Sequence, residues 1–175
     1  MKAKDLFNYE GDFAVLREPS RNVIAAYQNA NRFFDTIQEY VYIEQGMPNL
    51  AKAIHEQAHK FPQIFDRFAD MLHERHLMAE YPATAEMDWK ATLKSIDDVF
   101  ETIISVFEDI QDALEKFHML TDNGKLRPMA LFSEELMSAN SKDYTKFIQA
   151  WMRWNEDGGS KTSFDSWCRE LFEVD

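Results

Sequence analysis

The chain has 175 residues, of which 45% are hydrophobic and 29% are charged, a composition typical of one soluble globular domain. Its formal net charge of −12 disfavours direct binding to DNA phosphates, and the absence of an apolar run of 18 residues predicts no membrane span. The N-terminus lacks the apolar stretch of a signal peptide, and the single cysteine, Cys168, excludes an intrachain disulfide framework. We therefore expect a cytoplasmic protein.

Residues 8–18 precede Pro19 and are expected to form an extended arm. Beyond them, apolar residues recur at helical spacing in long segments that are separated by the few glycines and prolines of the chain. Ser20 is a favourable N-cap, and Gly46 followed by Pro48 ends the first segment. The pattern predicts helices over residues 20–45, 48–78, 89–120 and 128–155, and a short helix over 163–172.

Four long helices with short connections predict an all-α fold, an up-down-up-down four-helix bundle with a short C-terminal helix. The expected organisation is an N-terminal arm (1–19), the bundle (20–157) and a C-terminal tail that carries the short helix (158–175). Phenylalanines, which number 14, are expected to fill the core. Pro62 lies inside the second helix and is expected to kink or loosen one turn.

Polar side chains on the second predicted helix form a band away from its apolar stripe. Imidazoles and carboxylates together are ligands for iron, zinc and manganese. Asp70 follows His55 by about 22 Å along a helix, so one straight helix cannot bring both to one ion. An antiparallel copy across a two-fold axis would place His55 of one chain near Asp70 and Glu74 of the other. The candidate metal ligands are His55, His59, Asp66, Asp70 and Glu74.

The stretch over residues 55–75 resembles the second helix of the Dps family, the DNA-protection-during-starvation proteins or miniferritins. Residues 80–84 are similar to the Gly-Tyr-Pro segment that follows that helix in the family, and residues 146–152 are similar to the family's last bundle helix. The positions that match the family's helix pattern are His55, Asp70, Glu74 and Arg75.

The resemblance implies a ferritin-like bundle that assembles through a two-fold dimer of the second helix into a hollow dodecamer. It also implies Fe(II) oxidation and iron storage that protect against oxidative damage. The mixture of imidazoles and carboxylates would also suit zinc or manganese in place of iron. His55, Asp70 and Glu74 would be ligands, and His59 and Asp66 auxiliary ones. The family's first helix carries a further histidine ligand, and the residue nearest that position here is Tyr40. The ferroxidase site is therefore expected to be weakened, with Glu39 or Glu44 as replacements for that histidine.

Three other interpretations fit parts of the sequence. His55-Glu56-x-x-His59 matches the zinc-protease pattern, with Glu56 as general base and Glu74, His76 or Glu80 as third ligand. Glu56-x-x-His59 and Glu115-x-x-His118, near Glu44 and Glu134, match the Glu-x-x-His pairs of di-iron bundles, although Glu56 and Glu115 lie off the predicted core stripes. Four tryptophans would also suit a metal-free helical interaction module.

Overall fold

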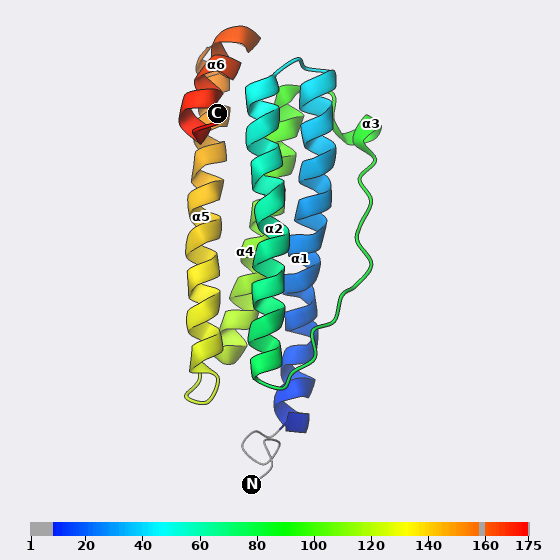
Figure 1. The fold of residues 1–175 in the computed structure, drawn as a ribbon, viewed down its shortest axis with the longest axis vertical. Helices are drawn as coiled ribbons and strands as arrows, with labels where there is room; N and C mark the ends of the chain where they lie inside the picture. Colours follow the sequence, from blue (N-terminus) through cyan, green and yellow to red (C-terminus); the bar gives the residue numbers. More distant parts are fainter. Residues whose placement is uncertain (1–8, 158–159, 175) are drawn as a thin grey trace.

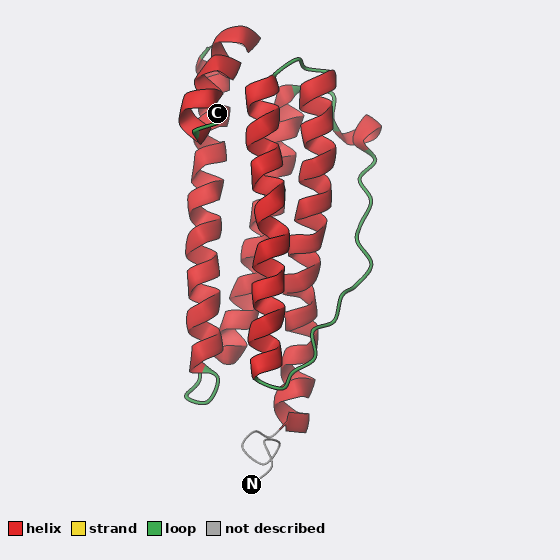
Figure 2. Cartoon of the chain, in the orientation of Figure 1, coloured by secondary structure: helices red, strands yellow, loops and turns green. Residues whose placement is uncertain are grey.

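The computed structural model describes residues 9–157 and 160–174, and within these ranges it contains helices and loops but no strand (Figure 2). Four long helices lie side by side in a bundle (Figure 1). A one-turn helix, α3 (Trp89–Thr92), precedes the third of them, and a short helix, α6 (Lys161–Phe172), follows the fourth. The long helices are α1 (Tyr9–Ile43), α2 (Pro48–Glu74), α4 (Ile96–Thr121) and α5 (Arg127–Glu156). The predicted all-α four-helix bundle with a short C-terminal helix is confirmed.

The connection between α2 and α4 is a long crossover that follows α1 along its length (Figure 1). Three contacts mark its course. The Nε of Arg17 on α1 lies 2.6 Å from a carboxylate oxygen of Glu80, Arg32 donates to the hydroxyl of Thr84 at 2.8 Å, and the ring of Tyr40 lies 6.3 Å from that of Trp89. The chain thus returns from the N-terminal end of α1 to its C-terminal end before α4 begins.

Helices α2 and α4 therefore run in the same direction, and the order is up-down-down-up. The expected alternation up-down-up-down is wrong in this respect, because it assumed a short second connection. The helix expected over 48–78 already ends at Glu74, and the helix expected from residue 89 begins only at Ile96. The residues between Glu74 and Ile96 form the crossover.

Local hydrogen bonds explain where α4 begins. The hydroxyl of Ser95 accepts a bond from the Asp98 N–H at 3.1 Å, and the Asp98 carboxylate accepts one from the Lys94 N–H at 2.9 Å and one from the Ser95 hydroxyl. This reciprocal arrangement satisfies donors that the first helical turn leaves free. Bonds from the Lys94 N–H and the Ser95 hydroxyl also hold the pKa of the Asp98 carboxyl below its ordinary value. Trp89, whose apolar spacing predicts the start of this helix, instead lies in the crossover that precedes α4.

Helix α1 passes through Pro19, where a break was expected. The prediction of an extended arm over residues 8–18 is wrong from Tyr9 onward, and Asn8 lies outside the described residues. Pro19 has no N–H to bond the carbonyl of Val15, but Val15 is 55% exposed and water can replace the donor. Leu16 is buried in the core, so packing keeps this end of the helix in place.

Helix α2 passes through Pro62 in a similar way, but its missing donor is replaced from within the protein. The carbonyl that would accept a bond from residue 62 belongs to Ala58, which is fully buried. The side-chain amide of Asn31 on α1 donates to this carbonyl at 3.1 Å. A neighbouring helix therefore satisfies the carbonyl that the proline leaves unpaired, and α2 remains helical to Glu74.

The middle of the bundle is packed with phenyl rings, one from each long helix. Phe34 of α1 makes edge contacts with Phe61 of α2, Phe107 of α4 and Phe147 of α5, at centroid distances of 5.1, 5.6 and 5.9 Å. All four rings are 2% exposed or less. Edge-to-face packing of this kind is favourable, and it leaves an apolar interior at this level.

Helix α6 closes one end of the bundle and caps α2. Phe164 and Cys168 of α6 are fully buried in the core. The carboxylate of Asp165 accepts hydrogen bonds from the backbone N–H groups of Asn49 and Leu50 at 3.3 and 2.9 Å. Since α2 has no capping side chain of its own, Asp165 supplies the acceptor at its positively polarised N-terminus.

Candidate metal-binding face of helix α2

The structure places all five predicted ligands on the exposed face of α2. His55, His59, Asp66, Asp70 and Glu74 are each exposed, whereas Ile54, Phe61, Phe68 and Leu72 of the same helix lie in the core. This separation follows from the helical period, because the polar residues fall between the positions of the apolar stripe. The face is therefore accessible to a metal ion or to another protein chain.

His55 and His59 form a close imidazole pair. They lie one helical turn apart, and their Nε2 atoms are separated by 3.0 Å. The rings meet edge to face, with centroids 4.3 Å apart and an interplanar angle of 88°. At this distance the two nitrogens can share a hydrogen bond, in which either ring can be the donor, depending on its tautomer. Two metal–nitrogen bonds of about 2.1 Å to these atoms would enclose an angle of about 90°, so the pair is also suited to chelate one ion.

The remaining predicted ligands are not gathered around this pair. Within the described ranges, 9–157 and 160–174, no three side chains of histidine, cysteine, aspartate or glutamate converge as a metal site. Asp70 and Glu74 lie one turn apart near the other end of α2. The single chain therefore presents an imidazole pair and a carboxylate pair near opposite ends of α2, at a separation that one straight helix cannot close.

Tyr40, the residue nearest the family's first-helix histidine, is engaged elsewhere. It is 7% exposed, its ring packs against Trp89, and its hydroxyl accepts a hydrogen bond from the side chain of Gln45 at 2.7 Å. Glu39 and Glu44, the expected replacements, line a pocket beside Trp89. In the described part of the chain, none of the three joins a group of metal-binding side chains around His55.

The zinc-protease interpretation is not supported by the geometry. Such a site needs a third protein ligand beside the two histidines. Of the candidates, Glu80 is engaged with Arg17 on α1, and neither Glu74 nor His76 meets the His55–His59 pair within the described residues. The pair therefore lacks the first coordination shell of a metalloprotease within one chain.

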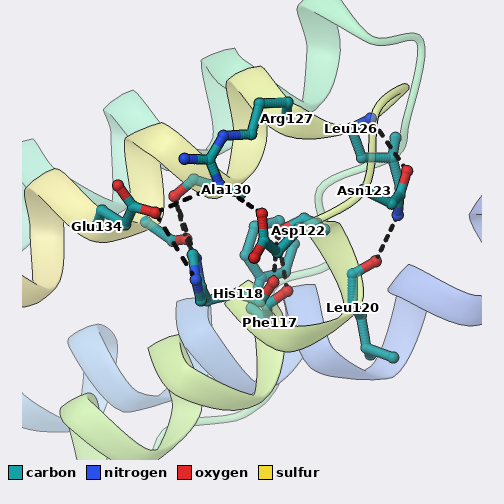
Figure 3. A network of polar contacts seen from close by, with 11 residues as sticks. Phe117, His118, Leu120, Asp122, Asn123, Leu126, Arg127, Ala130 and Glu134 are labelled. Atoms are coloured by element: carbon teal, nitrogen blue, oxygen red, sulfur yellow. Dashed lines mark hydrogen bonds and ion pairs between the residues drawn. The ribbon is translucent and has the colours of Figure 1, made fainter.

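The di-iron interpretation is wrong because its residues do not point into the bundle. Glu56, His59 and Glu115 are exposed, and phenyl rings occupy the interior at mid-bundle. His118 lies at the end of α4, where its Nδ1 is 3.2 Å from the hydroxyl of Ser133 and its Nε2 is 3.8 Å from a carboxylate oxygen of Glu134 (Figure 3). These contacts join α4 to α5 near their connecting turn.

Glu134 also lies 3.5 Å from the guanidinium of Arg127, which in turn pairs with Asp122 (Figure 3). The charge of Glu134 is thus shared with Arg127 as well as with His118. These contacts form a polar network that stabilises the turn between α4 and α5.

No described helix is both long and apolar enough to cross a membrane. No protein-family model matches the chain, and no curated protein sequence matches it. Among solved structures, the chain is similar to an iron-soaked variant of the ferritin PmFTN. The match has a TM-score of 0.80 and covers 86% of this chain and 96% of that chain at 12% sequence identity. The chain therefore has a ferritin-like fold, which its single long crossover also indicates.

Proposed function

We propose that this chain is a ferritin-like iron-binding protein of the miniferritin kind, which binds and oxidises Fe(II) at sites formed between two copies of α2. The observation that carries the proposal is the exposed imidazole pair of His55 and His59, whose Nε2 atoms are 3.0 Å apart. The ferritin-like fold and the iron-soaked ferritin among the structures it resembles support the choice of iron.

The register of α2 supports a shared site. In a two-fold antiparallel pair of helices, residues face each other when their numbers add to a constant. If His55 faces Asp70 of the second copy, the axis passes between Pro62 and Gln63, and His59 then faces Asp66 of that copy. In this register a carboxylate of the second copy lies opposite each imidazole, and the two-fold symmetry repeats the site on the other side of the axis.

The chemistry of this group suits Fe(II). Neutral imidazoles and carboxylates are the ligand types of non-haem iron, and the carboxylates offset the charge of the cation. Glu74, one turn beyond Asp70, extends the ligand set. The net charge of −12 also attracts cations to the protein surface. The residue nearest the position of the family's additional histidine is Tyr40, and its ring packs against Trp89. The site therefore lacks that ligand, and we expect weaker binding and slower oxidation than in members that have it.

The test combines oligomeric state with metal binding. Light scattering should show an assembly larger than the 20.6 kDa monomer, and anaerobic calorimetry should detect Fe(II) binding. Asp70→Ala with Glu74→Ala should remove binding and leave the helices folded, because both side chains are exposed. A matched control is Glu108→Ala with Asp112→Ala, a pair of acidic residues that is also exposed and lies one turn apart on α4. A monomer, or unchanged binding in the first double variant, would refute the shared site.

A further inference from the structure

A second candidate site lies at the C-terminal end of α1, where the crossover returns to the bundle. Here Trp89 of α3 contacts Tyr40 in the last turns of α1, and the two helices line an open pocket of about 380 Å³. In Figure 1 α3 stands out to the side of α1 at this end. The residues that line the pocket are Thr36, Glu39, Tyr40, Ile43, Glu44 and Trp89.

The walls of the pocket are mainly aromatic and aliphatic. The rings of Trp89 and Tyr40 are 6.3 Å apart and inclined at 51°, so they form a corner rather than a closed stack. The indole of Trp89 is 37% exposed, and Ile43 is 67% exposed. The apolar surface of Trp89 and Ile43 is therefore accessible to a ligand that binds between α1 and α3.

Two carboxylates accompany these walls. Glu39 and Glu44 are both exposed, and within the described ranges neither forms an ion pair. The ammonium of Lys90 lies 5.5 Å from the centroid of the Trp89 ring, so a cationic ligand would displace this ammonium or use the opposite face of the indole. Aromatic faces and uncompensated carboxylates both favour positive charge, whereas an anion would be repelled and a neutral apolar ligand would desolvate the carboxylates without compensation.

We propose that this pocket binds a small organic monocation with an apolar body, of the alkylammonium class. Methyl or methylene groups of the ligand contact Trp89, Tyr40 and Ile43, and its positive charge is stabilised by the indole face and by Glu39 and Glu44. A hydrated metal ion has no apolar surface with which to contact the aromatic and aliphatic walls. The site is separate from the metal-binding face of α2 and does not depend on it.

The test uses choline and its neutral isostere, 3,3-dimethylbutan-1-ol, with the full chain in metal-free buffer. The indole N–H signals of the four tryptophans are followed by NMR, and Trp89→Phe assigns the relevant one. Choline should shift the Trp89 signal saturably, and the alcohol should not. Glu39→Gln with Glu44→Gln should weaken choline binding about tenfold, because both attractive charges are removed.

The control is Glu108→Gln with Asp112→Asn on α4, which lowers the net negative charge equally and should leave choline binding unchanged. Three outcomes would overturn the proposal: no saturable shift at millimolar choline, equal binding of the alcohol, or unchanged affinity in the Glu39 and Glu44 double variant. That variant keeps both aromatic rings, so a loss of binding would report the removed charges. Circular dichroism shows independently whether the variant is folded.

Discussion

The hydrogen bond from Asn31 to the carbonyl of Ala58 provides a sharp test of how α2 tolerates Pro62. The donor lies on α1 and the acceptor on α2, 3.1 Å apart, and Ala58 is fully buried. Asn31→Ala would leave this carbonyl without a partner, because Pro62 has no N–H. An unsatisfied buried polar group costs about 1–3 kcal/mol, and the higher helix propensity of alanine returns up to about 0.6 kcal/mol. We expect Asn31→Ala to lower the free energy of unfolding by about 1–2 kcal/mol.

The same substitution should be nearly neutral once residue 62 can donate. In Pro62→Ala, the new backbone N–H can bond the Ala58 carbonyl within α2, so the loss of the Asn31 amide costs less than about 0.5 kcal/mol. The double-mutant cycle should therefore give a coupling energy of about 1–2 kcal/mol between residues 31 and 62. A loss of about 1–2 kcal/mol in Asn31→Ala corresponds to a decrease in melting temperature of roughly 2–8 °C for a chain of this size.

Urea denaturation followed by circular dichroism, at one fixed protein concentration, measures the four free energies. Asn22→Ala serves as the control, since Asn22 is exposed on the same helix and its replacement reports the propensity change alone. Equal costs of Asn31→Ala in the natural sequence and in the Pro62→Ala variant would show that the amide does not replace the missing donor.

Two further predictions concern stability. Asp165→Ala should lower the free energy of unfolding by about 2 kcal/mol, because the N-terminus of α2 loses the acceptor for its N–H groups. The control, Glu170→Gln on the exposed side of α6, should change the free energy of unfolding little, and equal effects of the two substitutions in urea denaturation would contradict the capping role. Burial, and secondarily the charge of Asp143, raises the pKa of Tyr27 above its ordinary value of 10.0. The folded state thus resists ionisation of Tyr27, so the contribution of this residue to stability should be constant below about pH 10 and fall as the pH rises further. Tyr27→Phe should reduce the alkaline loss of stability in urea denaturation, and an unchanged alkaline profile would refute the reasoning.

Periodicity in the amino-acid sequence is enough to predict the helical class and the two faces of α2. Apolar residues at spacings of three and four give each long helix one buried stripe, and this pattern needs no knowledge of neighbouring elements. It predicted that Phe61 and Phe107 lie in the core, and it separated His55, His59, Asp66, Asp70 and Glu74 from the apolar stripe of α2. The assignment of these residues as metal ligands stays a prediction.

The path of the chain between the helices depends on contacts that periodicity does not report. Apolar spacing near Trp89 resembles the start of a helix, but the reciprocal bonds of Ser95 and Asp98 begin α4 later, and the freed residues form the crossover. Contacts with α1, such as Arg17 with Glu80, fix its course, and these partners lie far apart in sequence. Helix direction and the pocket beside Trp89 follow from that course, so the spacing of apolar residues could not predict them.

Proline tolerance and helix capping likewise depend on contacts between elements. A proline removes one backbone donor wherever it occurs, and whether the helix continues depends on what satisfies the freed carbonyl. At Pro62 the partner is Asn31 on another helix, and at the start of α2 the acceptor is Asp165, which is remote in sequence. Local patterns report a residue's own preferences. The groups that compensate for a missing hydrogen bond are known only once the helices are packed, because tertiary contacts join residues without regard to their spacing in the chain.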